Sequence, residues 1–269
     1  MTHVRGLLRA TCLLMGTTCL FAQASFKEEI NLGVQAYKQA KYEEAIAHFR
    51  NAIDLEPQNV PSHLYLATAY AQQYIPGVDS PENIQLVENA ISEYQQVLKI
   101  EPQSIDSLKG VAYLYLQTKK FDDAKDFYRK AIQADPSDPE NYYSIGVIDW
   151  TQTYAPRMKL RAELGLKPDK SLPIDFPGCW QLRDSNAPVI KEGMDMTAKA
   201  LELRPDYDDA MAYMNLLYRE RAEIQCNDAA NRASDLAKAD HWVDLTIGMK
   251  RKKAARAESN NDSNSANPH

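Results

Sequence analysis

The chain has 269 residues, a formal net charge of −6 and a charged fraction of 25%. Acidic and basic residues are mixed along it, so it lacks the clustered Lys and Arg that give affinity for a phosphate backbone. The composition therefore disfavours nucleic acid as a partner and predicts a solvated, acidic surface on a chain long enough to bury a substantial core.

The first predicted element is a cleaved export signal in residues 1–24. Arg5 and Arg9 precede an apolar run, and Ala22-Gln23-Ala24 then supplies the small residues that a signal peptidase requires. The run is too short to span a bilayer of about 30 Å, which disfavours a retained anchor. Cleavage would shift the net charge from −6 to −8, because Arg5 and Arg9 are removed and no acid is.

Lipidation is a further alternative, because Cys12 and Cys19 lie within the apolar run. The residues before them lack the leucine and the small residues of a good lipobox, which disfavours a lipoprotein. We therefore expect a periplasmic or secreted mature chain with no integral membrane segment.

Two stretches of the mature chain nearly repeat each other: YEEAIAHFRNAIDLEPQN at residues 42–59 and FDDAKDFYRKAIQADPSD at residues 121–138. Each begins with an aromatic residue, has Ala three positions later, and ends its helical pattern with an acidic-Pro pair. Apolar residues recur at intervals of three and four, which predicts an amphipathic helix in each stretch. Such echoes are typical of a repeat protein.

The complete unit around each echo is 34 residues long, and its spacing resembles the tetratricopeptide repeat, a helix-turn-helix unit. Small residues recur at one site of the first helix, where two helices could approach closely: Gly33, Ala67, Ala112 and Gly146. In the first four units a proline follows the second helix, where it cannot continue the turn: Pro57, Pro102, Pro136 and Pro205.

The resemblance implies an all-α fold, a right-handed superhelical array of about five repeats over residues 25–257. The units in chain order are 26–59, 60–104, 105–138, 139–207 and 208–253. Units two, four and five carry insertions between their two helices, the longest at 154–188, and together these should build one rim. The tail, 258–269, has no apolar residue able to anchor it, which predicts disorder.

The mature chain has two cysteines, Cys179 in the long insertion and Cys226 at the end of the fifth unit's first helix. Both fall on the same expected rim in adjacent repeats, and export permits a disulfide. We expect a bridge between them, with two buried free thiols as the alternative. The absence of a C-x-x-C spacing disfavours a redox-active pair.

The resemblance also predicts which first-helix residues face the groove of the array and contact a protein or peptide partner. Tyr and Trp suit such contacts, because they bury a large area while keeping a polar edge. Packing against a neighbouring helix is the alternative for each aromatic residue. The candidate groove residues are Tyr37, Lys109, Tyr113, Tyr143, Trp150 and Arg219, with Val34, Leu64, Thr68 and Val147 beside them.

Motifs of catalysis and of metal or cofactor binding are absent from the sequence, so we expect no catalytic residue, metal site or cofactor. His63 is expected to be a packed, hydrogen-bonded side chain. The sequence thus predicts an exported, non-catalytic scaffold that binds a protein or peptide, in envelope assembly or maintenance. The alternatives are an enzyme or enzyme subunit with its site in residues 154–188, and a cell-wall glycan-binding module that uses tyrosines and Trp180.

Overall fold

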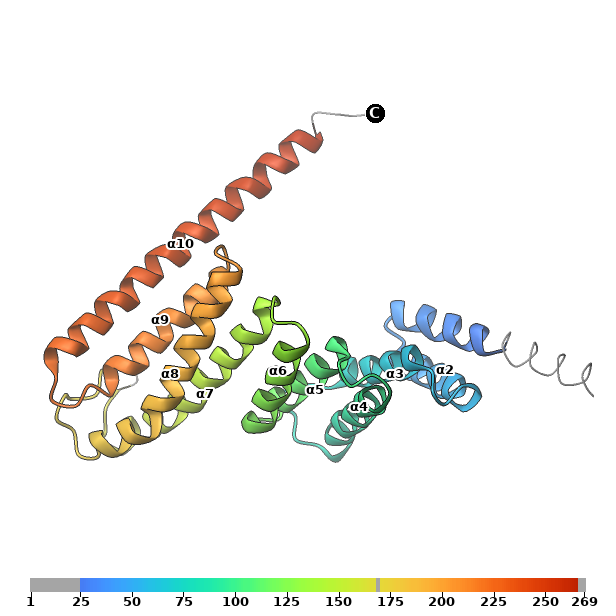
Figure 1. The fold of residues 1–269 in the computed structure, drawn as a ribbon, viewed down its shortest axis with the longest axis horizontal. Helices are drawn as coiled ribbons and strands as arrows, with labels where there is room; N and C mark the ends of the chain where they lie inside the picture. The colour runs from blue at the N-terminus through green and yellow to red at the C-terminus, as the bar shows by residue number, and fades with distance from the viewer. Residues whose placement is uncertain (1–24, 168–169, 266–269) are drawn as a thin grey trace, which may run out of the picture. The chain divides into compact units, whose positions relative to one another are not determined.

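The computed structural model describes residues 25–167 and 170–265, which form helices joined by turns, with no strand among them (Figure 1). The predicted export signal lies outside the described residues. A helix over residues 25–38 is followed by α2 (Tyr42–Leu55), α3 (Val60–Gln73), α4 (Pro81–Ile100), α5 (Ile105–Gln117), α6 (Phe121–Ala134), α7 (Pro139–Glu163), α8 (Cys179–Leu203), α9 (Asp208–Glu223) and α10 (Ala229–Ser265). The predicted all-α fold class is confirmed.

The chain separates into two compact units between Phe127 and Tyr128, within α6. In unit 1, α3 packs on α2 and α4, and α5 packs on α4 and α3. In unit 2, α8 packs on α7 and α9, α9 packs on α10, and α7 also contacts α9. The contacts of α3 with α5 and of α7 with α9 bring together the first helices of successive hairpins, which is how stacked repeats bury their apolar faces.

Proline and capping residues determine where these helices begin and end. The four predicted prolines each lie two residues beyond a helix, after α2, α4, α6 and α8. Caps start the next helices: the side chain of Asn59 accepts a hydrogen bond from Ser62 N (3.1 Å), and that of Asp138 accepts one from Glu140 N (2.9 Å). Both satisfy backbone donors that the first helical turn leaves unpaired.

The long insertion predicted in the fourth repeat, residues 154–188, lies in compact unit 2 and is mostly helical. The sequence suggests a separate short helix ending at Gly165 and an irregular stretch after it. Instead, α7 runs through Pro156 to Glu163, and α8 begins at Cys179, so the described residues between them, 164–167 and 170–178, are the part of the insertion that is not helical. Gly165 ends α7 with φ +66°, a conformation that glycine adopts without steric cost.

The last helix, α10, is 37 residues long and continues to Ser265, where the composition predicts disorder. Figure 1 shows it running beside α9 and then beyond it. A helix that is already nucleated on α9 gains one hydrogen bond per added residue, so its extension costs little. The described part of the predicted tail, residues 258–265, thus belongs to α10, and residues 266–269 lie outside the described residues.

None of the helices formed by residues 25–167 and 170–265 combines the length and the apolar content that spanning a bilayer requires.

Candidate functional site

One face of unit 1 is formed by side chains of the helix of residues 25–38, α3 and α5, and we call it the inner face. It rests on successive contacts from Gly33 to Phe49 and from Phe49 to Tyr65. A Cβ atom on Gly33 would lie 2.5 Å from Cε1 of Phe49, so the absence of a side chain lets the Phe49 ring lie against the helix of residues 25–38. Phe49 is only 1% exposed. Tyr65 of α3 stacks on it with ring centroids 5.4 Å apart and 29° between the planes. Stacking of this kind stabilises both rings beyond their burial.

Two hollows lie on this face, with Tyr65 and Thr68 lining both. Hollow A has a volume of about 340 Å³ and is lined by Val34, Tyr37, Lys38, Phe49, Tyr65 and Thr68. Hollow B has a volume of about 380 Å³ and is lined by Leu64, Tyr65, Thr68, Tyr94, Asp106 and Lys109. The helix of residues 25–38, α3 and α5 thus contribute side chains to adjoining depressions. Five of the predicted groove positions therefore lie in hollow walls.

The predicted residues of unit 1 differ in how far they are presented to solvent. Tyr37 is partly buried, with its ring edge-on to Tyr42 at 5.4 Å between centroids, and burial raises the pKa of its phenol. Lys109 is also partly buried. Tyr113 of α5 is 48% exposed. A partner could therefore gain contact area on Tyr113 without disturbing the core.

In unit 2 the predicted aromatic residues form a packed cluster. Tyr143 and Trp150 of α7 both contact Tyr213 of α9 edge-on, with centroids 5.5 Å and 5.6 Å apart. Tyr154 lies 5.0 Å from Trp150, and Tyr207 lies 4.9 Å from Tyr143. The expected groove residues of this unit are thus held by one another, and Tyr213 joins them.

Burial sets the ionisation of this cluster. It is the main cause that raises the pKa of Tyr143, Tyr207 and Tyr213 above the ordinary tyrosine value, and nearby acids such as Asp209 add to it. The phenols therefore remain neutral at physiological pH. Tyr207 donates a hydrogen bond to Oε2 of Glu140 (2.6 Å). The cluster can offer ring surface and neutral polar groups to a ligand, but no anionic oxygen of its own.

Arg219, the last predicted groove residue, is exposed and joins α9 to α10. Its guanidinium donates hydrogen bonds to Oδ1 of Asn215 (2.9 Å) and Oδ1 of Asp240 (2.7 Å). A partner would have to compete with these bonds or share them.

A buried ion pair fixes the helical part of the insertion. Arg157 donates from Nε and Nη2 to the two carboxylate oxygens of Glu220, both at 2.7 Å. Burial raises the pKa of Glu220, and the guanidinium of Arg157 opposes that rise. Burial is also the largest single effect on Arg157 and lowers its pKa, but the hydrogen bonds that Arg157 donates to Glu220 and the nearby negative charges together raise the pKa above its ordinary value. This two-point pairing explains why α7 continues past Pro156, since stopping there would leave Glu220 buried without its partner.

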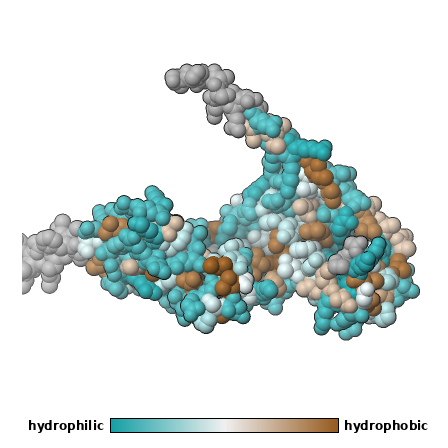
Figure 2. Space-filling view, turned by 180° about the vertical axis from the view of Figure 1, so that it is seen from behind, coloured by the Kyte–Doolittle hydropathy of each residue, from teal (hydrophilic) through white to brown (hydrophobic). Residues whose placement is uncertain are grey.

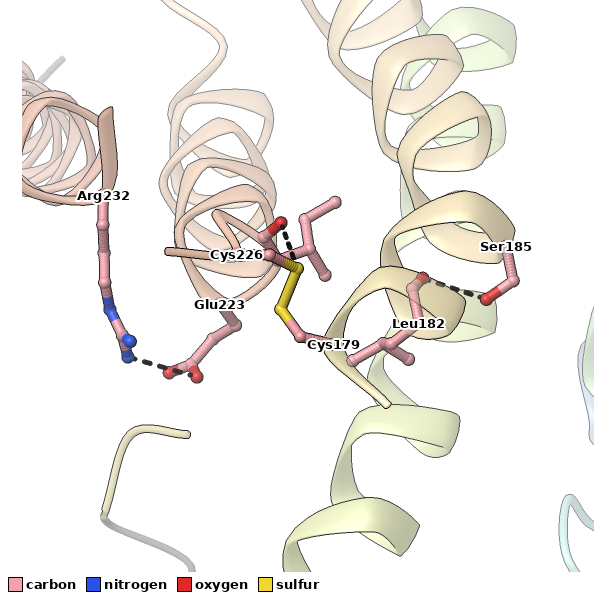
Figure 3. Close-up of a disulfide and its surroundings, with 7 residues drawn as sticks. Cys179, Leu182, Ser185, Glu223, Cys226 and Arg232 are labelled. Carbon is pink, nitrogen blue, oxygen red and sulfur yellow. Dashed lines mark hydrogen bonds and ion pairs between the residues drawn. A yellow bond between two sulfur atoms is a disulfide. The ribbon is translucent and has the colours of Figure 1, made fainter. Parts of the chain in front are cut away.

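The predicted disulfide is confirmed. Cys179 begins α8 and Cys226 follows α9, with Cα atoms 5.8 Å apart and both side chains buried (Figure 3). The loop residues 170–178, which precede α8, pack on the same turn: Leu172 N donates to Oε2 of Glu223 (2.7 Å), and Asn227 N donates to the carbonyl of Ile174 (3.0 Å). Figure 3 shows Arg232 reaching Glu223 from α10.

The charged groups near this loop are engaged in holding it. Glu223 accepts from Leu172 and pairs with Arg232 at 3.5 Å, and Arg161 donates to the carbonyl of Lys167 (3.2 Å). Within residues 25–167 and 170–265, no three His, Cys, Asp or Glu side chains are grouped so as to hold a metal ion. His63 is packed as predicted, with contacts to Glu93 (2.6 Å) and the Pro57 carbonyl (3.0 Å).

Tyr65 and Tyr213 are the residues that the sequence-based prediction missed. Tyr65 lies next to the predicted Leu64, and Tyr213 lies on the helix that carries the predicted Arg219. No spacing pattern points to either residue, because their importance comes from contacts with another repeat. Figure 2 shows one face of the molecule, on which hydrophilic residues predominate and hydrophobic residues lie in separate patches.

Comparison with known families and proteins gives one consistent result. A family described as tetratricopeptide repeat matches residues 87–145, and one described as TPR repeat matches residues 33–73. The protein CTR9 homolog of Arabidopsis thaliana is 24% identical over 136 residues. That match covers 48% of this chain and 12% of the relative, so the likeness reaches only a small part of the larger protein.

Solved structures of MamA resemble this fold. The crystal structure of MamA protein superposes with a TM-score of 0.58 at 14% identity, over 86% of this chain and 94% of that one. MamA 41-end from Desulfovibrio magneticus RS-1 gives a TM-score of 0.56 at 14% identity, over 85% and 96%. At this level of identity the likeness concerns the fold alone.

Proposed function

We propose that the chain, in which residues 33–73 and 87–145 match tetratricopeptide-repeat models, is a non-catalytic scaffold that binds a peptide segment of a partner protein. The observation that carries the proposal is that aromatic side chains with at least partial access to solvent lie on first helices of both units, with Tyr65 and Tyr113 exposed in unit 1 and Tyr143 and Trp150 partly buried in unit 2. In unit 1 Tyr65 borders hollows A and B, and in unit 2 the two aromatic side chains belong to the cluster around Tyr213. Such side chains are enriched where proteins bind one another.

We place this scaffold in the cell envelope. The export signal predicted in residues 1–24 and the buried Cys179–Cys226 bridge both support an oxidising compartment, because disulfides are rare in the cytosol. The intact mass of the mature protein tests the first point. We expect a chain that begins at Ser25 and is recovered with the envelope fraction. A full-length chain recovered with the cytosol would contradict it.

The glycan alternative has one observation in its favour, the exposed Trp180 beside the disulfide. Its ring lies under the guanidinium of Arg183, 5.3 Å from the ring centroid. A sedimentation assay with purified peptidoglycan separates the two functions. The scaffold proposal predicts that the protein stays in the supernatant, with or without a Trp180→Ala change.

Crosslinking in intact cells, followed by affinity capture, tests the scaffold proposal. The variant Tyr113→Ala/Trp150→Ala removes one aromatic contact from each unit. Losing such anchors costs about 1–2 kcal/mol each, so we expect recovery of the crosslinked partner to fall about tenfold or more. Quantitative mass spectrometry of the captured proteins provides the measurement.

The matched control is Ile84→Ala, because Ile84 is 47% exposed, much like Tyr113, but lies on the second helix of its hairpin. It should leave recovery unchanged. Circular dichroism and thermal unfolding establish that each variant is folded. Equal recovery by a folded Tyr113→Ala/Trp150→Ala variant would remove the inner faces from the proposal.

A further inference from the structure

Tyr65 occupies a distinctive place on the inner face of unit 1, because one ring serves as a wall of both hollow A and hollow B. It is 42% exposed, yet stacking on the almost fully buried Phe49 supports it from below. Phe49 in turn lies against Gly33. An exposed ring on such a fixed base forms a ridge whose position a partner can rely on, which lowers the entropy cost of binding.

The two hollows differ in charge. Hollow A is lined by apolar groups and aromatic rings, and its one charged side chain is the exposed Lys38. The hydroxyl of Thr68 already donates to the Leu64 carbonyl at 2.7 Å. The lining of hollow A therefore favours an apolar group with an anion beside it.

Hollow B contains both a cation and an anion in its lining, Lys109 and Asp106, so its net charge is zero. The phenol of Tyr94 lies 3.4 Å from the Thr68 hydroxyl, which turns its polar end toward the protein. This hollow favours a second apolar group without a charge requirement. Both volumes are near the lower end of the roughly 300–1,000 Å³ that ligand sites occupy, so each hollow has room for one large side chain of a peptide.

We propose that Tyr65 is the specificity-determining residue of unit 1, and that it divides the face into two sockets for a linear peptide. The segment carries two large apolar side chains, one on each side of the Tyr65 ring, and a carboxylate beside the first that pairs with Lys38. This inference rests on the proposed function and names the partner class for unit 1.

The test uses the purified full chain and fluorescein-labelled ten-residue peptides in a Gly/Ser background. The probes carry two Leu at separations of one to four residues and an Asp next to the first Leu. Fluorescence anisotropy reports binding. We expect one separation to bind most tightly, and replacement of either Leu by Ser to weaken that peptide about tenfold or more, because each Leu buries apolar surface in its hollow.

Variants of the protein test the roles of the two residues. Tyr65→Ala should weaken the best peptide about tenfold, whereas Tyr65→Phe should retain most of the affinity because the ring still stacks on Phe49. Exchanging Asp for Lys in the peptide should weaken binding up to about fivefold, the range of an exposed ion pair. Lys38→Gln should abolish that preference for Asp, a coupling that a merely structural role of Lys38 would not produce.

Several outcomes would overturn the inference. If no separation binds, or if Tyr65→Ala binds like the unchanged chain, the sockets are not a peptide site. If sedimentation shows a dimer that Tyr65→Ala dissociates, a second copy of the chain occupies the face instead.

Failure of this inference is distinguishable from failure of the proposed function. A cellular partner lost in Tyr113→Ala/Trp150→Ala but retained in Tyr65→Ala would refute the Tyr65 assignment alone. A partner retained in both variants would refute the inner-face function itself.

Discussion

Gly146 of α7 shows how closely these helices approach at single residues. A Cβ atom there would lie 2.3 Å from Oγ1 of Thr197 and 3.2 Å from the carbonyl oxygen of Gly193, both on α8. The Gly193 carbonyl belongs to the backbone and cannot move aside by changing a rotamer. The site therefore has room for the hydrogen atom of glycine but not for the methyl group of alanine without a shift of its neighbours.

Gly146→Ala should lower the free energy of unfolding by about 1–3 kcal/mol, the usual cost of overpacking a core. Urea denaturation measures it. Gly248→Ala is the control, because no atom lies within 4 Å of a Cβ at Gly248 in α10. That change should stabilise the helix by up to about 1 kcal/mol through alanine's better helix propensity. Equal loss from both changes would contradict the close contact.

At this scale the sequence predicts contacts within a repeat better than contacts between repeats. The shared small-residue site of Gly33 and Gly146 follows from the spacing of the units, and the structure confirms a close approach at both. Tyr65 and Tyr213 could not be predicted in this way. Their roles depend on which side chain of the neighbouring hairpin, such as Phe49 or Tyr143, happens to lie opposite.

Between elements, the start of α9 is tied to α10 by charge. Lys253 of α10 donates a hydrogen bond to Asp208, and Lys250 approaches Asp209 at 4.0 Å. The hydrogen bond from Lys253 is the main cause that lowers the pKa of Asp208, against the opposing effect of burial. A carboxyl whose pKa is lower when folded stabilises the fold above its unfolded pKa of about 3.9 and loses that contribution as the pH falls.

Lys253→Met should therefore lower the free energy of unfolding at pH 7. It should also make that free energy fall less steeply as the pH drops from about 5 to about 3. Lys253 is 43% exposed, so screening limits the effect to about 0.2–1 kcal/mol. Urea titrations at several pH values measure it. Lys252→Met, a change at the exposed neighbouring residue, should leave the pH profile as it is. The same flattening in both variants would argue against the Asp208 pairing.

The extent of the helices could be predicted only where local signals dominate. The helices α2, α4, α6 and α8 each end just before a proline. Proline lacks the N–H that the next helical hydrogen bond requires, and no other interaction offsets that loss at these sites. Pro156 and Pro188 carry the same local signal but lie inside α7 and α8. There, tertiary packing and the Arg157–Glu220 pair outweigh the lost hydrogen bond, and such long-range terms cannot be read from neighbouring residues.

Within each unit, most contacts run between successive helices, with α3–α5 and α7–α9 in addition, and the bridge between Cys179 and Cys226 lies in unit 2. In a repeat protein, stability passes from each repeat to its neighbours. The all-α class and the bridge could be predicted from repeat spacing. The superhelical course of the complete array remains a prediction.

Reducing the bridge should accordingly destabilise one part of the chain. Its loop of 47 residues corresponds to about 4 kcal/mol in the chain-entropy model. We expect amide hydrogen exchange to rise around residues 170–228 on reduction and to stay unchanged in residues 42–117. The variant Cys179→Ser/Cys226→Ser should show the amide exchange rates of the reduced chain, and adding the reductant should not change them. A rise of equal size in both segments would contradict local propagation of stability.

The bond between Cys179 and Cys226 also constrains the order of events in the life of the protein. A polypeptide containing a covalent ring cannot pass through a narrow channel as a single extended thread. If the chain is exported unfolded, as its first residues suggest, ring closure has to follow passage. The covalent link between the start of α8 and the turn after α9 would then form only on the far side of the membrane.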